Sequence, residues 1–228
     1  MKRRIIFGWA LSSLLVFSYP GRLSAGLIDS FDSSGFAGVL FTSPSSDSLD
    51  EAVAGVAGGQ RFLEATATAA TSLVNSIGFE IAGGSANYSS GPSADGTLEF
   101  LYDGPSLPSA FPEPMSSISL DFALFDAAFD AAMDVTITVS DGVNSADLTQ
   151  SLITASMTPF SFAFDLSMFN NVGAVDLGNL GSIDIFFDPA AGQDFEINGV
   201  SFTMMPEPST LVLLALGVVA WLGVAFHR

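Results

Sequence analysis

The sequence predicts an all-β protein, with a single β-sandwich or jelly-roll-like domain between an N-terminal signal peptide and a C-terminal transmembrane helix. Three observations carry this prediction. Apolar and polar residues alternate with a period of two through most of the central region. Turn-forming dipeptides separate the alternating runs, and an uncharged apolar run lies near each end of the 228-residue chain. Because no helical pattern alternates with the strands, a sandwich is favoured over an α/β fold.

Five central runs show the alternation clearly. In residues 117–124, the apolar residues Ile118, Leu120 and Phe122 alternate with serine and aspartate. Since successive side chains of a strand point to opposite faces, each such run indicates a strand that is buried on one face. The central phenylalanines fall mainly on the apolar faces, so we expect them in the core. The other four runs are residues 97–102, 134–140, 160–166 and 182–187.

The last alternating run, residues 194–203, contains an irregularity. Phe195 and Ile197 alternate with acidic residues, but the phase changes at Asn198-Gly199 before the next apolar residues. One inserted residue shifts the side-chain alternation of a strand in this way. The run therefore predicts a bulge or a tight turn inside a terminal strand or hairpin.

Three further segments are less regular. Residues 65–70 (ATATAA) are expected to form a strand, because threonine favours strands. Residues 43–59 are rich in serine, glycine and alanine, and are expected to form a loop. Residues 124–132 are expected to form a short helix, because they are rich in alanine and place Phe125 and Phe129 four residues apart.

The N-terminus has the composition of a secretory signal peptide, residues 1–25. A basic start, Met1 to Arg4, precedes the apolar residues 5–19. Leu23 and Ala25 then fit the small or apolar positions of a signal-peptidase site, so cleavage is expected after Ala25 or after Gly26. The alternative is an uncleaved N-terminal anchor. The apolar run is short for a membrane span, which favours the signal peptide and makes signal peptidase the expected partner.

The C-terminus ends in a second apolar segment. Residues 211–226 are all apolar, and the uncharged stretch extends back to Pro208, so residues 209–226 are expected to form a marginal transmembrane helix. Trp221 and the terminal His227-Arg228 fit an interfacial anchor followed by a short basic tail. Membrane contact is therefore expected, at least transiently, through this helix.

The start of this segment carries a family resemblance. Pro206-Glu207-Pro208 is followed by Ser-Thr, an apolar helix and a basic end, and this arrangement resembles the PEP-CTERM sorting signal of exported bacterial proteins. The resemblance implies that residues 206–228 are recognised by an exosortase, which cuts near Pro-Glu-Pro. It also implies a host that makes extracellular polysaccharide or biofilm matrix. The tail departs from the family pattern, with one arginine instead of a cluster. The alternative is an ordinary C-terminal anchor.

The expected domain, residues 27–205, differs in charge from both ends of the chain. Of the 24 acidic residues only Glu207 lies outside this segment, and Arg61 is its only lysine or arginine, which gives 23 acids against one base. Such a surface repels nucleic acid and anionic lipid, so neither is an expected partner. Arg61 is expected to pair with nearby carboxylates. The chain has no cysteine, which excludes disulfides and thiolate chemistry.

The sequence predicts no enzyme. The only histidine is His227, outside the expected domain, so nucleophilic triads of the Ser-His-Asp or Cys-His type are excluded. A pair of carboxylates for glycoside hydrolysis needs only two acids and stays an alternative. Sugar sites usually use tryptophan or tyrosine, however, and only Tyr88 and Tyr102 lie in the expected domain.

Acidic residues near both ends of the domain are the candidate metal ligands. Calcium takes six to eight oxygen ligands, and it often ties the first and last strands of a jelly roll together. A second acidic set, Asp126, Asp130 and Asp134, has four-residue spacing. The alternative for both sets is ordinary solvated acids. The candidate calcium ligands are Asp29, Asp32, Asp194 and Glu196.

The function expected from these observations is that of an exported, non-enzymatic surface or extracellular-matrix protein. It would be sorted through the Pro206-Glu207-Pro208 signal and would have a structural or adhesive role in a polysaccharide or biofilm layer. The alternative is a carbohydrate-binding or calcium-dependent lectin-like module on the same domain. Extracellular polysaccharide is thus an expected partner, and calcium the one candidate cofactor.

Overall fold

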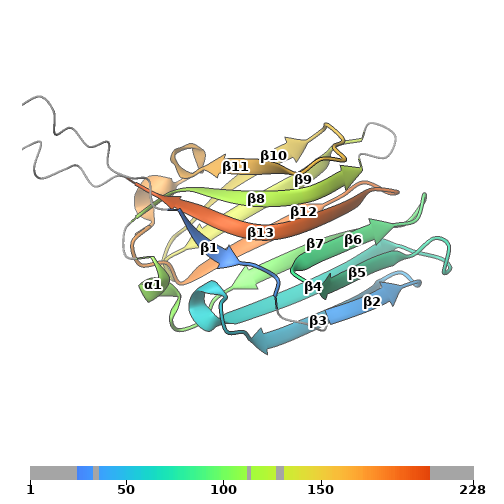
Figure 1. Ribbon diagram of the computed structural model, residues 1–228, viewed down its shortest axis with the longest axis horizontal. Helices are drawn as coiled ribbons and strands as arrows, with labels where there is room; N and C mark the ends of the chain where they lie inside the picture. The colour runs from blue at the N-terminus through green and yellow to red at the C-terminus, as the bar shows by residue number, and fades with distance from the viewer. Residues whose placement is uncertain (1–24, 33–35, 112–113, 127–130, 206–228) are drawn as a thin grey trace, which may run out of the picture. The chain divides into compact units, whose positions relative to one another are not determined.

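A computed structural model describes residues 25–32, 36–111, 114–126 and 131–205 (Figure 1). Residues Ala25–Met204 form one compact unit. In it two antiparallel sheets lie over one another, as the prediction of an all-β sandwich required. No helix of the described residues is both long and apolar enough to cross a membrane. The expected signal peptide and C-terminal helix fall almost wholly outside the described residues.

The first sheet, sheet A, has the strand order β11-β8-β13-β6-β5-β2. Strand β13 is its centre, because it pairs with β8 along its length and with two strands on its other side. The first half of β13 pairs with β6, and its second half pairs with β1. The strands are β1 (Ala25–Asp29), β2 (Phe36–Leu40), β5 (Ile77–Ala82), β6 (Ser85–Ser90), β8 (Met115–Asp126), β11 (Phe160–Asp165) and β13 (Asp194–Met204).

The second sheet, sheet B, has the strand order β10-β9-β12-β7-β4-β3. Its strands are β3 (Ser45–Ala52), β4 (Gln60–Ala69), β7 (Asp95–Tyr102), β9 (Met133–Ser140), β10 (Ser145–Leu152) and β12 (Ser182–Asp188). The helices are one or two turns long and lie in connections. They are η1 (Ala57–Gly59), α1 (Leu107–Ala110), η3 (Leu166–Met168) and η4 (Val172–Ala174).

The core lies between the sheets and is rich in phenylalanine. Phe187 of β12 stacks on Phe195 of β13 with ring centroids 5.1 Å apart, and Phe100 of β7 meets Phe187 edge-on at 5.8 Å. The first contact joins the two sheets, and the second lies within sheet B; each such pair adds about 0.5–1.5 kcal/mol beyond the burial of its area. In both sheets the buried positions alternate along the strands. The strands predicted from the period-two alternation are confirmed.

Two smaller predictions are also confirmed. Residues 65–69 belong to β4, as their threonine content indicated. The register of β13 against β8 shifts between Ile197 and Gly199, where the sequence pattern changes phase. The partner strand β1 has a matching irregularity between Leu27 and Asp29.

The predicted helix over residues 124–132 is wrong. Leu124, Phe125 and Asp126 are the end of β8, where they pair with β13, and residues 131–132 are not helical; residues 127–130 lie outside the described part of the chain. Pairing with the central strand of the sheet outweighs the helical preference of a few alanines, because propensity differences amount to about 0.7 kcal/mol or less per residue.

The predicted loop over residues 43–59 is wrong for Ser45–Ala52, which form β3. This strand lies at the edge of sheet B and pairs only with β4. Most of its side chains are exposed or half-buried, because an edge strand is held by backbone pairing and needs little apolar surface. The strand therefore lacks the apolar alternation that identified the others.

Candidate functional site

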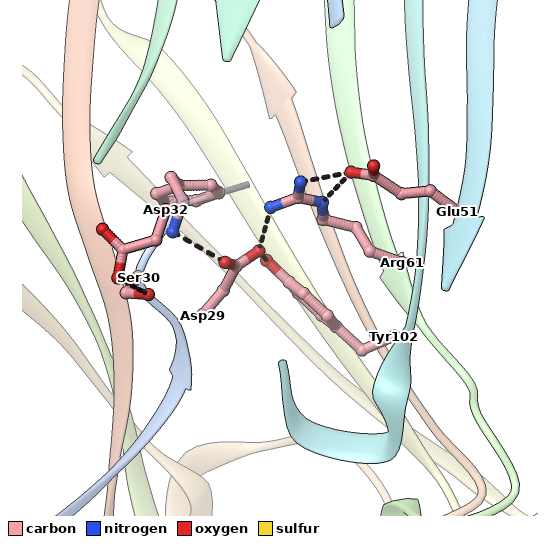
Figure 2. A network of polar contacts seen from close by, with 7 residues as sticks. Asp29, Ser30, Asp32, Glu51, Arg61 and Tyr102 are labelled. Atoms are coloured by element: carbon pink, nitrogen blue, oxygen red, sulfur yellow. Dashed lines mark hydrogen bonds and ion pairs between the residues drawn. The ribbon is translucent and has the colours of Figure 1, made fainter. Parts of the chain in front are cut away.

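Asp29, the first predicted calcium ligand, lies at the end of β1 and is buried. Its Oδ1 atom accepts a hydrogen bond from the backbone N–H of Phe31 at 2.8 Å. Its Oδ2 atom accepts one from Nη1 of Arg61 at 2.7 Å and one from the hydroxyl of Tyr102 at 3.1 Å (Figure 2). Both carboxylate oxygens of Asp29 are thus engaged by donors of the chain itself.

Arg61 completes this network from the inner face of β4. Its Nε donates to Oε1 of Glu51 in β3 at 3.2 Å, and its Nη2 donates to the same oxygen. The side chains of Arg61 and Asp29 are each 1% exposed, which makes their ion pair fully buried. Burial alone lowers the pKa of Arg61, but the charge of Asp29 and the hydrogen bonds to Glu51 and Asp29 outweigh it and raise the pKa. The predicted pairing of Arg61 with carboxylates is confirmed.

The network joins the two sheets. Asp29 comes from β1 of sheet A, whereas Glu51, Arg61 and Tyr102 come from β3, β4 and β7 of sheet B (Figure 2). Burial first, and then the charge of Asp29, raise the pKa of Tyr102 well above its usual value, so its hydroxyl stays protonated and donates. A buried network with its partners in place rigidifies the fold. We therefore assign these residues a structural role that holds β1 against sheet B.

The other predicted calcium ligands lie elsewhere. Asp32 accepts a hydrogen bond from the hydroxyl of Ser30 at 2.7 Å, and Oδ1 of Asp194 accepts one from the backbone N–H of Ser90 at 3.1 Å. Asp29 is opposite Val200 of β13, six residues beyond Asp194 in the sequence. At about 3.3 Å per residue this separates the two acids by roughly 20 Å along the strand.

Glu196 lies on β13 between these two points, where it pairs with Asn87 of β6. The register thus spreads Asp29, Asp194 and Glu196 along β13 and does not gather them. Among the described residues, no group of three or more histidine, aspartate or glutamate side chains has a geometry that holds a metal ion. Calcium binding at Asp29, Asp32, Asp194 and Glu196 stays a prediction.

The second acidic set is also divided between elements. Asp126 ends β8 and pairs with Asp194 of β13, so these two acids are neighbours in sheet A. Asp134 lies in β9 of sheet B, where it accepts a hydrogen bond from the hydroxyl of Ser151. Asp130 lies outside the described residues. Burial and the nearby Asp126 raise the pKa of Asp194, although the N–H of Ser90 opposes them.

An open groove of about 630 Å³ crosses the outer face of sheet A over β2, β5, β6 and β13. Small outward-facing residues, Ala37, Gly78 and Ser89, form its floor. A Cβ atom on Gly78 would lie only 2.8 Å from Oγ of Ser89, so glycine keeps this floor low. The groove exists because Gly78 and Ser89 pair across β5 and β6, and Ala37 lies two residues along β2 from Val39, the β2 partner of Gly78.

The walls of the groove combine polar and apolar groups. Glu80, Asn87 and Asp194 supply carboxylate and amide groups, and Val39 and Leu124 supply apolar surface. Carboxylates accept hydrogen bonds from hydroxyl groups, and an amide both accepts and donates them. This arrangement is therefore suited to a ligand that is rich in hydroxyl groups.

The aromatic residues below the groove are not available for stacking. Tyr88 and Phe195 line it, but their side chains are 2% and 1% exposed and they stack on each other at 5.1 Å. The Tyr88 hydroxyl donates to the carbonyl oxygen of Gly96 at 3.3 Å, inside the sandwich. Of the groove residues, sequence reasoning had singled out only Asp194 as a candidate ligand.

The residues after the last strand match a known sorting motif. A family model for the PEP-CTERM protein-sorting motif matches residues 206–228, the segment that begins with Pro206-Glu207-Pro208. The chain carries a PEP-CTERM sorting motif. The resemblance noted in the sequence is thereby confirmed. These residues lie outside the part that the structure describes, and the motif leaves open what the β-sandwich of this chain does.

Comparison with solved structures gives carbohydrate-binding modules. One is the family 11 module of the cellulase Lic26A-Cel5E of Clostridium thermocellum, at 13% identity, with 82% of this chain and 98% of that chain covered and a TM-score of 0.41. Another is TmCBM61 in complex with β-1,4-galactotriose, at 13% identity, 73% and 91% coverage and a TM-score of 0.34. Such scores carry no argument about the ligand of this chain. No curated protein matches the chain.

Proposed function

We propose that this PEP-CTERM protein is an exported, non-enzymatic surface or extracellular-matrix protein with a structural or adhesive role in a polysaccharide layer. The sorting motif at residues 206–228 is the observation that carries the proposal. Signal peptidase would remove residues 1–25, and an exosortase-type enzyme would process the C-terminal segment, with its membrane helix at residues 209–226. Residues 27–205 would then be the functional domain.

The position of the motif supports processing without damage to the fold. Strand β13 ends at Met204, and only Met205 separates it from Pro206. A cut near Pro-Glu-Pro would leave every strand of both sheets intact. This matters because β13 is the centre of sheet A, and a cut a few residues earlier would remove part of its pairing with β1 and β8.

Intact-mass spectrometry of the protein purified from its host tests this proposal. We expect a chain that begins at Gly26 or Leu27 and ends between Pro206 and Ser209, recovered from the cell surface or the matrix. A matched variant, Glu207→Ala with Pro208→Ala, should keep the C-terminal segment and stay in the membrane fraction. A wild-type mass that extends to Arg228 would contradict processing, and cytosolic protein with Met1 intact would contradict export.

The groove on sheet A favours a second candidate function, the binding of a neutral glycan. Its polar walls, Glu80, Asn87 and Asp194, offer partners for hydroxyl groups, and its floor of small side chains leaves room for a sugar chain. Calcium is an optional part of this candidate, because Asp194 and Glu196 belong to the predicted ligand set. Glycan arrays with and without chelator would test both points.

A groove-filling variant sharpens that test. Ser89→Trp places a large side chain on the floor of the groove, whereas Ser145→Trp places one on an exposed position of β10 in sheet B. Saturable glycan binding that Ser89→Trp reduces at least tenfold, and that Ser145→Trp leaves unchanged, would support the candidate. Equal binding by both variants would exclude the groove. A loss with chelator would support a role for calcium.

A further inference from the structure

The outer face of sheet B carries two rows of side chains that cross on its central strands β4, β7 and β12. The apolar row is Phe62, Leu101 and Phe186. The acidic row is Glu64, Glu99 and Asp184. Residues that share a level across antiparallel strands lie side by side on the face. The pairing of neighbours is Phe62 with Leu101, Leu101 with Asp184, Glu64 with Glu99, and Glu99 with Phe186. We call these six residues, Phe62, Glu64, Glu99, Leu101, Asp184 and Phe186, the crossed face.

The apolar row faces away from the core. Along β4, β7 and β12 the inward residues are buried, while Phe62, Leu101 and Phe186 alternate with them and are half-buried. The neighbouring outward positions of β9 and β10 are threonine, serine and aspartate. Phenyl rings are thus concentrated on the middle strands of a sheet face that needs no apolar residue to close the core.

Among the described residues, no ion pair neutralises the acidic row. Glu64 and Glu99 are direct cross-strand neighbours of like charge, which is an unfavourable pair. Burial, and then the charge of Glu64, raise the pKa of Glu99. Burial, and then the charge of Glu99, raise the pKa of Asp184 to about 6. Oδ1 of Asp184 is the one buried side-chain oxygen or nitrogen of the described residues that has no hydrogen-bond partner.

The domain, residues 27–205, has no further cation for this face. Arg61 is the only lysine or arginine among residues 27–205, and it lies on the inner face of β4, where it pairs with Asp29 and Glu51. A ligand that neutralises the acidic row must therefore come from outside the domain. A metal ion is a poor candidate, since the described residues hold no group of three or more ligands with suitable geometry.

We propose that the crossed face binds a polysaccharide whose sugars carry free, protonated amino groups. The flat faces of the sugar rings pack on Phe62 and Phe186, and the ammonium groups lie beside Glu99 and Asp184. The two phenylalanines are two strands and two residues apart in register, which corresponds to roughly 12 Å and is a span for consecutive rings of one sugar chain. The charge of the ligand complements the face, and its rings match the phenyl groups.

Other occupants fit this face less well. A second copy of the domain, or an anionic lipid surface, would bring negative charge against the acidic row. A peptide that adds a strand needs a free sheet edge, but β4, β7 and β12 each pair with a neighbour on both sides. A ligand can therefore contact this face only through the side chains of the face. A basic polypeptide would supply charge for the carboxylates, whereas an amino sugar polymer supplies both charge for the carboxylates and sugar rings for the phenyl groups.

Titration calorimetry with the processed protein from its host tests the proposal. The probes are a glucosamine hexamer and its N-acetylated counterpart, at low salt and about pH 6. We expect the glucosamine hexamer to bind at least about tenfold more tightly, because acetylation removes its charge and leaves its ring faces. Asp184→Asn and Phe186→Ala should each weaken binding at least fivefold. Asp184→Asn removes a repelled charge, so this variant is expected to fold.

Two control variants separate the face from general attraction to an acidic protein. Asp121→Asn removes one charge from the outer face of sheet A, outside the groove, and keeps an acceptor for the Ser161 hydroxyl. Phe41→Ala removes a ring that is 50% exposed and lies outside the crossed face. Both should leave binding unchanged. The proposal is overturned if Asp121→Asn weakens binding as much as Asp184→Asn, if the two hexamers bind equally, or if hexalysine binds as tightly as the glucosamine hexamer.

The inference rests on the proposed function in one respect only: export brings the domain to a place where it can contact such a polymer. Export and processing are tested by mass, and the face is tested by binding with purified protein. A correctly processed protein that shows no preference for the free amine would overturn the inference and leave the proposed function standing. A protein that binds the free amine but keeps residues 206–228 would overturn the proposed processing and leave the inference standing.

Discussion

Replacing Arg61 with leucine should destabilise the domain more than any other single loss of charge. The guanidinium lies 2.7 Å from the Asp29 carboxylate, and both side chains are 1% exposed. Without it, Asp29 stays buried with a charge that only two weaker donors, the Tyr102 hydroxyl and the Phe31 N–H, still contact. Removing one partner of a buried ion pair costs about 3–5 kcal/mol, and the remaining donors place Arg61→Leu near about 3 kcal/mol.

Urea and thermal unfolding measure this change. For a domain of this size each kcal/mol lowers the melting temperature by about 2–4 °C, so we expect a decrease of about 6–12 °C. The double variant Asp29→Asn with Arg61→Leu removes the stranded charge and should recover part of the loss. Glu51→Gln, which changes the partner that is 21% exposed, should cost only about 1 kcal/mol.

Two results would refute this reasoning. An Arg61→Leu variant less than about 1 kcal/mol below the wild type would show that the pair is not an essential tie between β1 and sheet B. Simple additivity of Asp29→Asn and Arg61→Leu would show that the two side chains do not interact in the folded protein.

Two further predictions concern the pH dependence of stability and the substitution of one buried glycine. Asp184 has a raised pKa of about 6, so between about pH 4 and pH 6 the folded state holds a proton that the unfolded state loses; stability therefore falls as pH rises through this window. The melting temperature should be higher at pH 5 than at pH 7.5, and Asp184→Asn should flatten the difference; an unchanged slope would contradict the assignment. Gly104→Ala should cost about 1–3 kcal/mol, because its Cβ would lie 2.0 Å from the Gly58 carbonyl oxygen. Gly173→Ala, with nothing within 4 Å, is the matched control, and an equal loss would argue against the contact.

The alternation of the sequence was enough to predict the sandwich, because the inward face of a strand depends on local spacing alone. Phe100 and Phe187 were assigned to the core in this way and are buried. Strand β3 could not be found by the same signal, since its pairing with β4 runs through the backbone and its side chains are mostly polar. The end of β8 was misassigned because alanine content outweighed a strand pairing that only the folded chain supplies.

The candidate sites depended on register, which the sequence does not contain. The first and last strands do pair, as the calcium hypothesis assumed, but Asp29 is opposite Val200 and not near Asp194. Arg61 was expected to find carboxylates, yet nothing in the sequence selects Asp29 over the other acids. The groove combines the β5–β6 hairpin with β2 and β13, and the crossed face combines β4, β7 and β12; apart from the hairpin, these strands are distant in the sequence and adjacent only in the sheets.

The proposed processing would change the electrostatics of this protein as well as its location. The full chain has a formal charge of −18, but five of its six basic residues lie in the segments that signal peptidase and exosortase would remove. The remaining base, Arg61, is buried in the network that holds β1. The processed domain would therefore present carboxylates with no exposed lysine or arginine to offset them. It would be repelled by anionic membrane and by its own copies within about 8–10 Å at physiological salt. Charge would then favour its release into a layer of cationic polymer, which connects the position of the sorting motif to the chemistry proposed for the crossed face.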